Sequence, residues 1–325
     1  MTAKKYIGKI TDDVKMSCSR LPALLGKSSW STPNDELRKS INAQTETKHN
    51  DNAPSEQAHW GNVHEGAILQ EIVKRLQLQN EQLEITTPVK HKQVPLEGSL
   101  DGLADGCGLT VTTDKDAGIF VIGQNEITLH GVGVLEAKST TAFPEDVPAD
   151  SRGPIQVQGL MACGGYNWAA IGVLYQGSTL RIFLYERDPA LIEKLENDVL
   201  DFQNRVDNYN LTGDLDAYPV FSANDAVETY GQSTDTAIDL TGKDAELVED
   251  LLHAKITEKS VKKYIGELQA AIMNAMGEHS TAYVRDEDNT AHTQITWGMT
   301  PARNQYTVAA RPAQRSKSIR VKELS

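Results

Sequence analysis

The sequence predicts an α/β fold: a central mixed β-sheet flanked by helices, followed by a C-terminal helical and β appendage. Two observations lead to this expectation. Apolar residues recur at helical spacing in several segments, and short apolar runs interrupted by Gly, Asp and Asn lie between those segments. Such alternation of helical and β-type segments is typical of a sheet covered by helices. A long polar stretch, 209–240, separates this region from the end of the chain.

The helical segments are delimited by capping residues, Pro and Gly. A short helix is expected to end at Gly26, because glycine favours the left-handed conformation just beyond a helix end. The polar residues 46–58 predict a loop, and the apolar spacing over 59–79 predicts a helix after it. Further helices are expected to begin at Thr32-Pro33, at Pro154 and at Pro189, and to cover 244–276.

The β-type segments fill the intervals between the helices. They cover 83–91, 95–101, 118–122, 127–130 and 133–138, and a hairpin is expected from 168–175 and 179–185. We therefore expect residues 1–208 to form one core, with an extended hairpin insert at about 103–131. Residues 209–240 are expected to be a linker or excursion, and 241–325 a helix-plus-strand extension. That extension ends in a basic tail, since 301–325 contains six Lys or Arg residues and one acid.

Composition excludes several classes of protein. With 325 residues, 39% hydrophobic and 24% charged, the chain has the make-up of a folded globular protein. It contains no run of about 18 apolar residues and no apolar signal-peptide core, so we expect a cytoplasmic protein (host cytoplasm if a phage encodes it) that does not bind membranes. The single cysteines Cys18, Cys107 and Cys163 disfavour a disulfide framework or thiolate zinc site. The net charge of −13 disfavours indiscriminate coating of nucleic acid but permits a local basic groove.

The chemistry is most distinct at Glu136-Ala137-Lys138. An acid two residues before a lysine occurs three times in the chain, but only here does it end an apolar β-type run. Both side chains then lie on one face of a strand, and Asp101 on an adjacent strand can face them and share a metal. Carboxylates bind hard divalent cations, and an ammonium can orient an attacking water. The alternative interpretation is a surface salt bridge at a strand end.

The wider order of motifs is specific. Ser19 is followed by Gly61-Asn62-Val63-His64-Glu65, then Asp101, then Glu136 with Lys138, then Gln156-Val157-Gln158. With these motifs in this order, the chain resembles the phage λ-type exonucleases, also called YqaJ-like viral recombinase nucleases. This family is a branch of the PD-(D/E)XK superfamily with a restriction-endonuclease-like core. The resemblance runs from about Met16 to Asn208.

The resemblance implies a role for each motif residue. Glu65, Asp101 and Glu136 match the carboxylates at the metal site, and the main-chain carbonyl of Ala137 matches a further metal ligand. Lys138 matches the lysine that contacts the attacking water or the scissile phosphate. Because these ligands are oxygens, with no clustered His or Cys, they suit Mg²⁺ or Mn²⁺ rather than Zn²⁺, with two ions at one site.

Two further groups follow from the same resemblance. The glutamine motif maps onto Gln156 and Gln158, and we expect Gln158 to reach the catalytic site, with Gln156 near the DNA. Ser19 and Ser99 match serines that hold the 5′-terminal phosphate. An arginine usually completes that pocket, and Arg20, adjacent to Ser19, is the candidate for it, with Lys15 as a substitute. Because Arg20 is not clearly in the family's arginine position, dependence on a 5′-phosphate stays open.

The implied function is a Mg²⁺-dependent 5′→3′ double-stranded DNA exonuclease of a phage-type recombination system. It would resect linear duplex ends to 3′ single strands for a single-strand annealing protein, as a homotrimeric ring. Two other functions remain open: a structure-selective or site-specific DNA endonuclease on the same core, and a non-catalytic DNA-binding recombination scaffold. An exonuclease digests linear but not covalently closed DNA, which distinguishes it from an endonuclease. Behaviour that does not depend on metal, without nucleotide release, would favour the non-catalytic scaffold.

Overall fold

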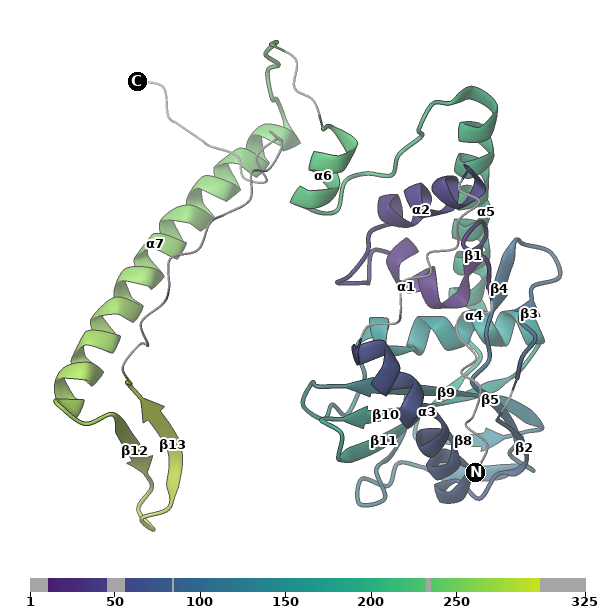
Figure 1. The fold of residues 1–325 in the computed structure, drawn as a ribbon, viewed down its shortest axis with the longest axis horizontal. Helices are drawn as coiled ribbons and strands as arrows, with labels where there is room; N and C mark the ends of the chain where they lie inside the picture. Colours follow the sequence, from purple (N-terminus) through teal and green to yellow (C-terminus); the bar gives the residue numbers. More distant parts are fainter. Residues whose placement is uncertain (1–10, 46–55, 84, 232–234, 299–325) are drawn as a thin grey trace. The chain divides into compact units, whose positions relative to one another are not determined.

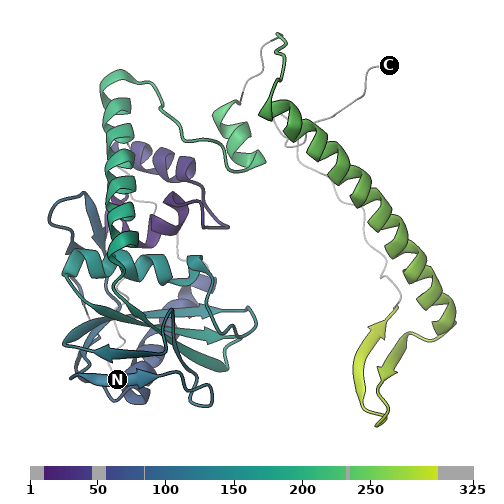
Figure 2. The same cartoon turned by 180° about the vertical axis from the view of Figure 1, so that it is seen from behind.

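The computed structural model describes residues 11–45, 56–83, 85–231 and 235–298, which belong to two compact units, Met1–Thr229 and Tyr230–Ser325. Figures 1 and 2 show the elements of each unit from opposite sides. The basic tail within 301–325 lies outside the described residues, as does most of the loop expected at 46–58.

The first unit contains the expected helices and strands with some shifts of boundary. Its elements in chain order are β1 (Met16–Ser17), a 3-10 helix η1 (Cys18–Arg20), α1 (Leu21–Leu24), α2 (Pro33–Thr45), α3 (Glu56–Arg75), β2 (Gln79–Gln82), β3 (Val89–Lys90), β4 (Leu96–Gly98), β5 (Gly102–Asp105), β6 (Leu109–Thr112), β7 (Ile119–Val121), β8 (Glu126–Leu129), β9 (Val132–Thr140), a 3-10 helix η2 (Asp150–Arg152), α4 (Pro154–Gly164), β10 (Trp168–Tyr175), β11 (Thr179–Glu186), α5 (Pro189–Thr212) and α6 (Ala223–Thr229). Helix α6 lies in the segment expected to be a linker.

The main sheet is mixed. Its strand order is β2-β5-β9-β10-β11-β7. Strand β9 pairs antiparallel with β5 and parallel with β10, while β11 is antiparallel to β10 and parallel to β7. Helices cover both faces of this sheet (Figure 1). The predicted α/β class, with a mixed sheet flanked by helices, is confirmed.

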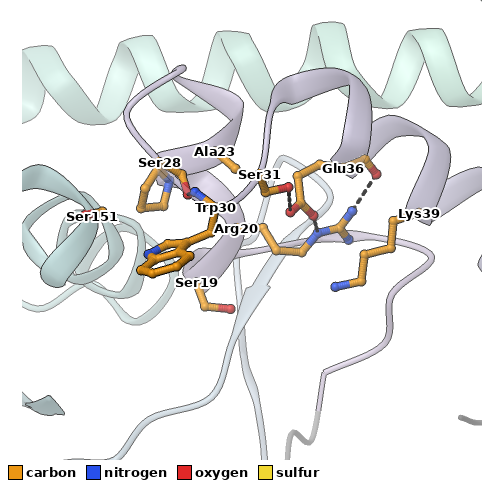
Figure 3. Close-up of a pocket in the computed structure, with 10 residues that line it drawn as sticks. Ser19, Arg20, Ala23, Ser28, Trp30, Ser31, Glu36, Lys39 and Ser151 are labelled. Carbon is orange, nitrogen blue, oxygen red and sulfur yellow. Dashed lines mark hydrogen bonds and ion pairs between the residues drawn. The ribbon is translucent and has the colours of Figure 1, made fainter. Parts of the chain in front are cut away.

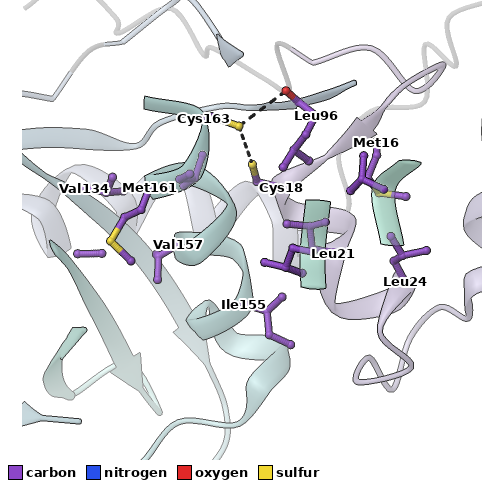
Figure 4. Close-up of a cluster of buried hydrophobic side chains, with 14 of the residues drawn as sticks. Met16, Cys18, Leu21, Leu24, Leu96, Val134, Ile155, Val157, Met161 and Cys163 are labelled. Atoms are coloured by element: carbon purple, nitrogen blue, oxygen red, sulfur yellow. Dashed lines mark hydrogen bonds between the residues drawn. The ribbon is translucent and has the colours of Figure 1, made fainter. Parts of the chain in front are cut away.

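Alternation along β9 assigns the two faces. Val134 belongs to a core that includes Val157, Leu160 and Met161 of α4, whereas Leu135 belongs to a second core with Ile68, Leu69 and Ile72 of α3. Glu136 and Lys138 lie in step with Val134, so they emerge on the face covered by α4. Figure 4 shows the α4 core, where the buried Cys18 and Cys163 thiols lie 3.8 Å apart.

The segment expected as a hairpin insert, 103–131, is built differently. Only β6 and β8 form a separate two-stranded antiparallel sheet. Strand β5 lies inside the main sheet, and β7 extends its far edge by pairing with β11. The reason is non-local: the apolar side chains of β7 pack against those of β11, as Phe120 does against Phe183, with ring centroids 5.4 Å apart.

A small sheet holds the N-terminal part against the core. Its order is β1-β4-β3, with Ser17 of β1 paired in parallel with Glu97 of β4. Close packing at this point requires glycine, because a Cβ atom on Gly98 would lie 2.8 Å from the Cys18 sulfur and 2.4 Å from Leu160. The chain from β4 to β5 thus approaches η1 and α4, which places Asp101 beside the end of β9.

The second unit contains a long helix and a hairpin. Helix α7 (Lys243–Met276) is one continuous helix, and β12 (Thr281–Arg285) pairs antiparallel with β13 (Ala291–Thr296). In the part of the chain that the structure describes, no helix combines the length and apolar character needed to cross a membrane.

Candidate active site

Four residues meet where β9 passes beneath the first turn of α4. Lys138 Nζ donates to Glu136 Oε1 at 2.5 Å and to Gln156 Oε1 at 3.0 Å. Gln156 Nε2 in turn donates to the same Glu136 oxygen at 2.8 Å. Glu136 is 1% exposed, whereas the Lys138 side chain is 30% exposed. The ammonium is therefore fixed by two acceptors yet open to a substrate.

Asp101 joins this cluster through the backbone of β9. The β5–β9 ladder ends at the pair Gly102–Leu135, and just beyond it Asp101 Oδ2 accepts the Ala137 N–H at 2.9 Å. The N–H and C=O of one residue in a strand point to the same side, so the Ala137 carbonyl also faces the Asp101 side. The structure thus brings together two carboxylates, a main-chain carbonyl and an ammonium.

Burial and the closeness of the charges shift the pKa values of Glu136 and Lys138. Burial, followed by the negative charge of Asp101, raises the pKa of Glu136 to about 8, although Lys138 opposes the shift. Burial by itself would lower the pKa of Lys138, but the carboxylates of Glu136, Asp101 and Glu65 outweigh it and raise that pKa overall. Lys138 is therefore a cation at neutral pH, and Glu136 lacks enough positive charge nearby to ionise fully.

Glu65 approaches from α3 on the other side of β9. Its negative charge contributes to the raised pKa of Lys138, and the neighbouring His64 Nδ1 lies 3.4 Å from Ser139 Oγ on β9. Among the described residues, however, no three His, Cys, Asp or Glu side chains are close enough to hold one metal ion. That Glu65, Asp101 and Glu136 share the same cations stays a prediction.

The glutamine that contacts the cluster is Gln156, whereas we expected Gln158. Gln158 Nε2 donates to the Glu186 carbonyl at 2.7 Å, and its Oε1 accepts the Asp188 N–H at 2.9 Å. Two residues apart on a helix, the side chains point in different directions, and the buried packing of Val157 between them fixes which one faces β9. Gln158 instead links α4 to the start of α5.

The structure also corrects the expected role of Arg20 at the terminal phosphate. The guanidinium is buried, and each of its N–H groups already donates a hydrogen bond within the protein. Its Nε donates to Glu36, and its Nη atoms donate to the carbonyls of Asp13, Lys15 and Glu36 and to Ser40 Oγ. These bonds use all five N–H donors of an arginine. Arg20 therefore attaches η1 to α2 and has no donor left for a terminal phosphate.

The serines expected at the phosphate lie on accessible backbone near the cluster. Ser19 is exposed, 3.2 Å from Ser17 Oγ, and Ser99 is half-buried between β4 and β5. Ser19 lines a cleft of about 340 Å³, together with Lys39 and the indole of Trp30, which is 88% exposed (Figure 3). Nothing in the sequence pointed to Lys39 or Trp30, because the cleft is lined jointly by η1, α2 and the loop between α1 and α2.

The cluster fits a hard divalent cation. Glu136 Oε2 is buried and has no hydrogen-bond partner. A buried carboxylate oxygen without a partner is costly, and a cation would satisfy it and lower the pKa of Glu136. Mg²⁺ commonly uses only one or two carboxylates, completing its shell with water and substrate phosphate. Asp101, Glu136 and the Ala137 carbonyl supply such a partial set of oxygen ligands.

No family model and no curated protein matches the chain. Its structure is similar to those of alkaline and phage-related exonucleases. The alkaline exonuclease LHK-Exo of Laribacter hongkongensis is 16% identical over 61% of this chain and 90% of its own, with a TM-score of 0.43. The structure of LHK-Exo in complex with dAMP is 17% identical over 61% of this chain and 91% of its own, with a TM-score of 0.44. A phage-related exonuclease from Haemophilus somnus is 14% identical over 62% of this chain and 96% of its own, with a TM-score of 0.39. Substrate and reaction therefore rest on the residues of the site.

Proposed function

We propose that this protein is a metal-dependent deoxyribonuclease on a PD-(D/E)XK core, with its active site at Asp101, Glu136, Ala137, Lys138 and Gln156. One observation carries the proposal: Glu136 is buried beside a second carboxylate and a lysine, with one oxygen unpartnered. A structural salt bridge does not require that orphaned oxygen or the second carboxylate. A metal-dependent phosphodiester hydrolase would use both to bind its cation.

The residues of the cluster have separate tasks in this scheme. Asp101, Glu136 and the Ala137 carbonyl would hold Mg²⁺ or Mn²⁺, which supplies Lewis-acid activation of water and stabilises charge at phosphorus. Lys138 would contact a scissile phosphate or the incoming water, since its two acceptors leave a third N–H to donate. Gln156 holds the Lys138 ammonium and the Glu136 carboxylate in register. Glu65 contributes negative charge at the margin.

The finer activity that we propose follows the sequence resemblance. It is 5′→3′ exonuclease action on linear duplex ends, leaving 3′ single strands, with two Mg²⁺ ions per site. A homotrimeric ring and a single-strand annealing partner, in a phage-type recombination system, belong to the same proposal. Ser19 and Ser99 are the candidate contacts of the terminal phosphate, with Lys39 as the nearby cation in the cleft.

The test is the substitution Lys138→Ala. We expect it to abolish Mg²⁺-dependent release of nucleotides from linear duplex DNA while DNA binding in a gel-shift assay survives. A matched control is Lys74→Ala, which removes a lysine on α3 whose side chain is 76% exposed and should leave the rate unchanged. Near wild-type digestion by Lys138→Ala would show that this lysine is misassigned.

A second measurement distinguishes the kinds of nuclease. Covalently closed circular and linear duplexes are incubated with the enzyme and Mg²⁺, with and without EDTA. An exonuclease digests only the linear form, and only without EDTA. Cutting of the closed circle would identify an endonuclease, and DNA binding without nucleotide release in any condition would identify a non-catalytic scaffold.

A further inference from the structure

Helix α7 contains a heptad repeat along its length. Residues spaced alternately by four and three positions are all apolar except one. They are Leu247, Leu251, Ala254, Glu258, Val261, Ile265, Leu268, Ile272 and Ala275. A strict alternation of three and four is the pattern of a coiled-coil seam, whereas a helix packed on a globular core shows a wider apolar stripe. One face of the helix therefore carries a seam suited to another helix, while Val248, Leu252 and Ile256 lie outside that seam.

Among the described residues of its own unit, Tyr230–Ser325, that face is largely exposed. Within α7 only Met276 is buried, and five seam residues are between 42% and 65% exposed: Leu247, Val261, Ile265, Leu268 and Ile272. A helix of 34 residues is about 51 Å long and obtains most of its stability from packing of its apolar face. Helix α5 has similar spacing, but its apolar residues are already buried in the core of the first unit.

We infer that α7 pairs in parallel with α7 of a second copy of this chain, forming a two-stranded coiled coil that joins two of the rings proposed above. With Leu268 at position d, Ile265 and Ile272 occupy position a, and β-branched residues at a with Leu at d favour two strands. Small alanines at d, Ala254 and Ala275, allow close approach of the two backbones.

Charges at the rim of the seam favour the parallel orientation. Asp250 occupies position g and Lys255 the following position e, so each Asp250 meets Lys255 of the other copy when the helices run parallel. The one acidic seam residue, Glu258, accepts from Lys262 of its own helix at 2.6 Å. That ion pair draws its carboxylate toward the rim and offsets the repulsion between two copies of Glu258.

The test uses the full chain and matched double variants. Ile265→Asp with Leu268→Asp places charges in the seam, while Ile256→Asp with Met273→Asp makes the same change on the same helix outside it. By sedimentation equilibrium at micromolar concentration, we expect the seam variant to have about half the mass of wild type and the control variant to match wild type. Equal masses for wild type and the seam variant would overturn the pairing, whether α7 is free, packs within its own chain or binds another protein.

Cross-linking tests the register independently of any association by the first unit. Cys18 and Cys163 are buried, and Cys107 is exposed, so Cys107→Ser provides the background. A short bismaleimide should link two chains through Leu268→Cys, because position d faces its own copy in a parallel pair, but not through Ser260→Cys at position c. Absence of the Leu268→Cys dimer, or a linked trimer, would overturn the parallel two-stranded assignment. Nuclease assays on the same variants keep this outcome separate from that of the proposed activity.

Discussion

At Glu136, burial and hydrogen bonding act in opposite directions on one carboxylate. Burial and Asp101 favour the neutral acid, while Lys138 favours the anion. The balance leaves a pKa near 8, so the metal-free site holds a proton that a cation would displace. The same residue is thus poorly solvated without metal and well suited to binding one.

This protonation predicts how stability depends on pH in EDTA. Folded Glu136 keeps its proton up to about pH 8, whereas in the unfolded chain it ionises near its ordinary value of 4.5. Between these values the folded state binds more protons, so raising the pH lowers the free energy of unfolding, by at most about 1.4 kcal/mol per pH unit. Urea unfolding of wild type and Glu136→Gln at several pH values measures this. The difference between the two proteins should change across that window, and parallel curves would contradict the prediction.

The two glutamines of α4 are expected to have different roles, Gln156 in activity and Gln158 in stability. Gln156→Ala removes a partner of Lys138 and Glu136, so nuclease activity should fall at least ten-fold, with less effect on stability. Gln158→Ala leaves the Glu186 carbonyl and the Asp188 N–H without their partner, which should cost about 1–3 kcal/mol of stability while the active site persists. Urea unfolding and the nuclease rate, measured on both variants, should give opposite rankings. If the same variant were the more affected in both measurements, the two glutamines would not have the separate roles predicted.

Among the elements, β9 and α4 show which features of the site could be predicted from the sequence and which could not. Strand periodicity predicted that Glu136 and Lys138 share a face, and the structure places them in contact, because this relation is local. The choice between Gln156 and Gln158 depended on the rotation of α4, which is set by packing between distant segments. The pairing of β7 with β11 was hidden for the same reason. Nothing near Ser19 indicated that Arg20 would be buried against Glu36, a residue of α2.

The attachment of η1 to α2 yields a prediction at this scale. Arg20→Ala leaves Glu36 buried without its ion-pair partner, a change that typically costs about 3–5 kcal/mol. Lys74→Ala, which removes an exposed pair with Glu71, should cost at most about 1 kcal/mol. Urea unfolding compares the two variants.

The milder substitution Arg20→Lys tests the role of this residue at the phosphate. It should leave the ratio of nuclease rates on 5′-phosphorylated and 5′-hydroxyl duplexes unchanged. A ratio that falls toward one would return Arg20 to the phosphate site.

On the scale of the whole molecule, the two units divide the proposed tasks. All the residues of the candidate active site, and both apolar cores around it, belong to Met1–Thr229. The seam of α7 belongs to Tyr230–Ser325. The proposed chemistry and the proposed pairing of α7 therefore belong to separate parts of the sequence, so we expect a change in one to leave the other intact.

A chain that ends at Thr229 tests this division. Its cores and catalytic cluster are complete, so we expect cooperative unfolding and retention of Mg²⁺-dependent nucleotide release from short linear duplexes. Because it lacks α7, its mass by sedimentation equilibrium should match that of the full-length Ile265→Asp/Leu268→Asp variant after correction for the missing residues. A folded but inactive 1–229 chain would show that the second unit contributes to the chemistry. Association of 1–229 beyond that of the seam variant would show that the first unit pairs through a surface that the second unit normally restricts.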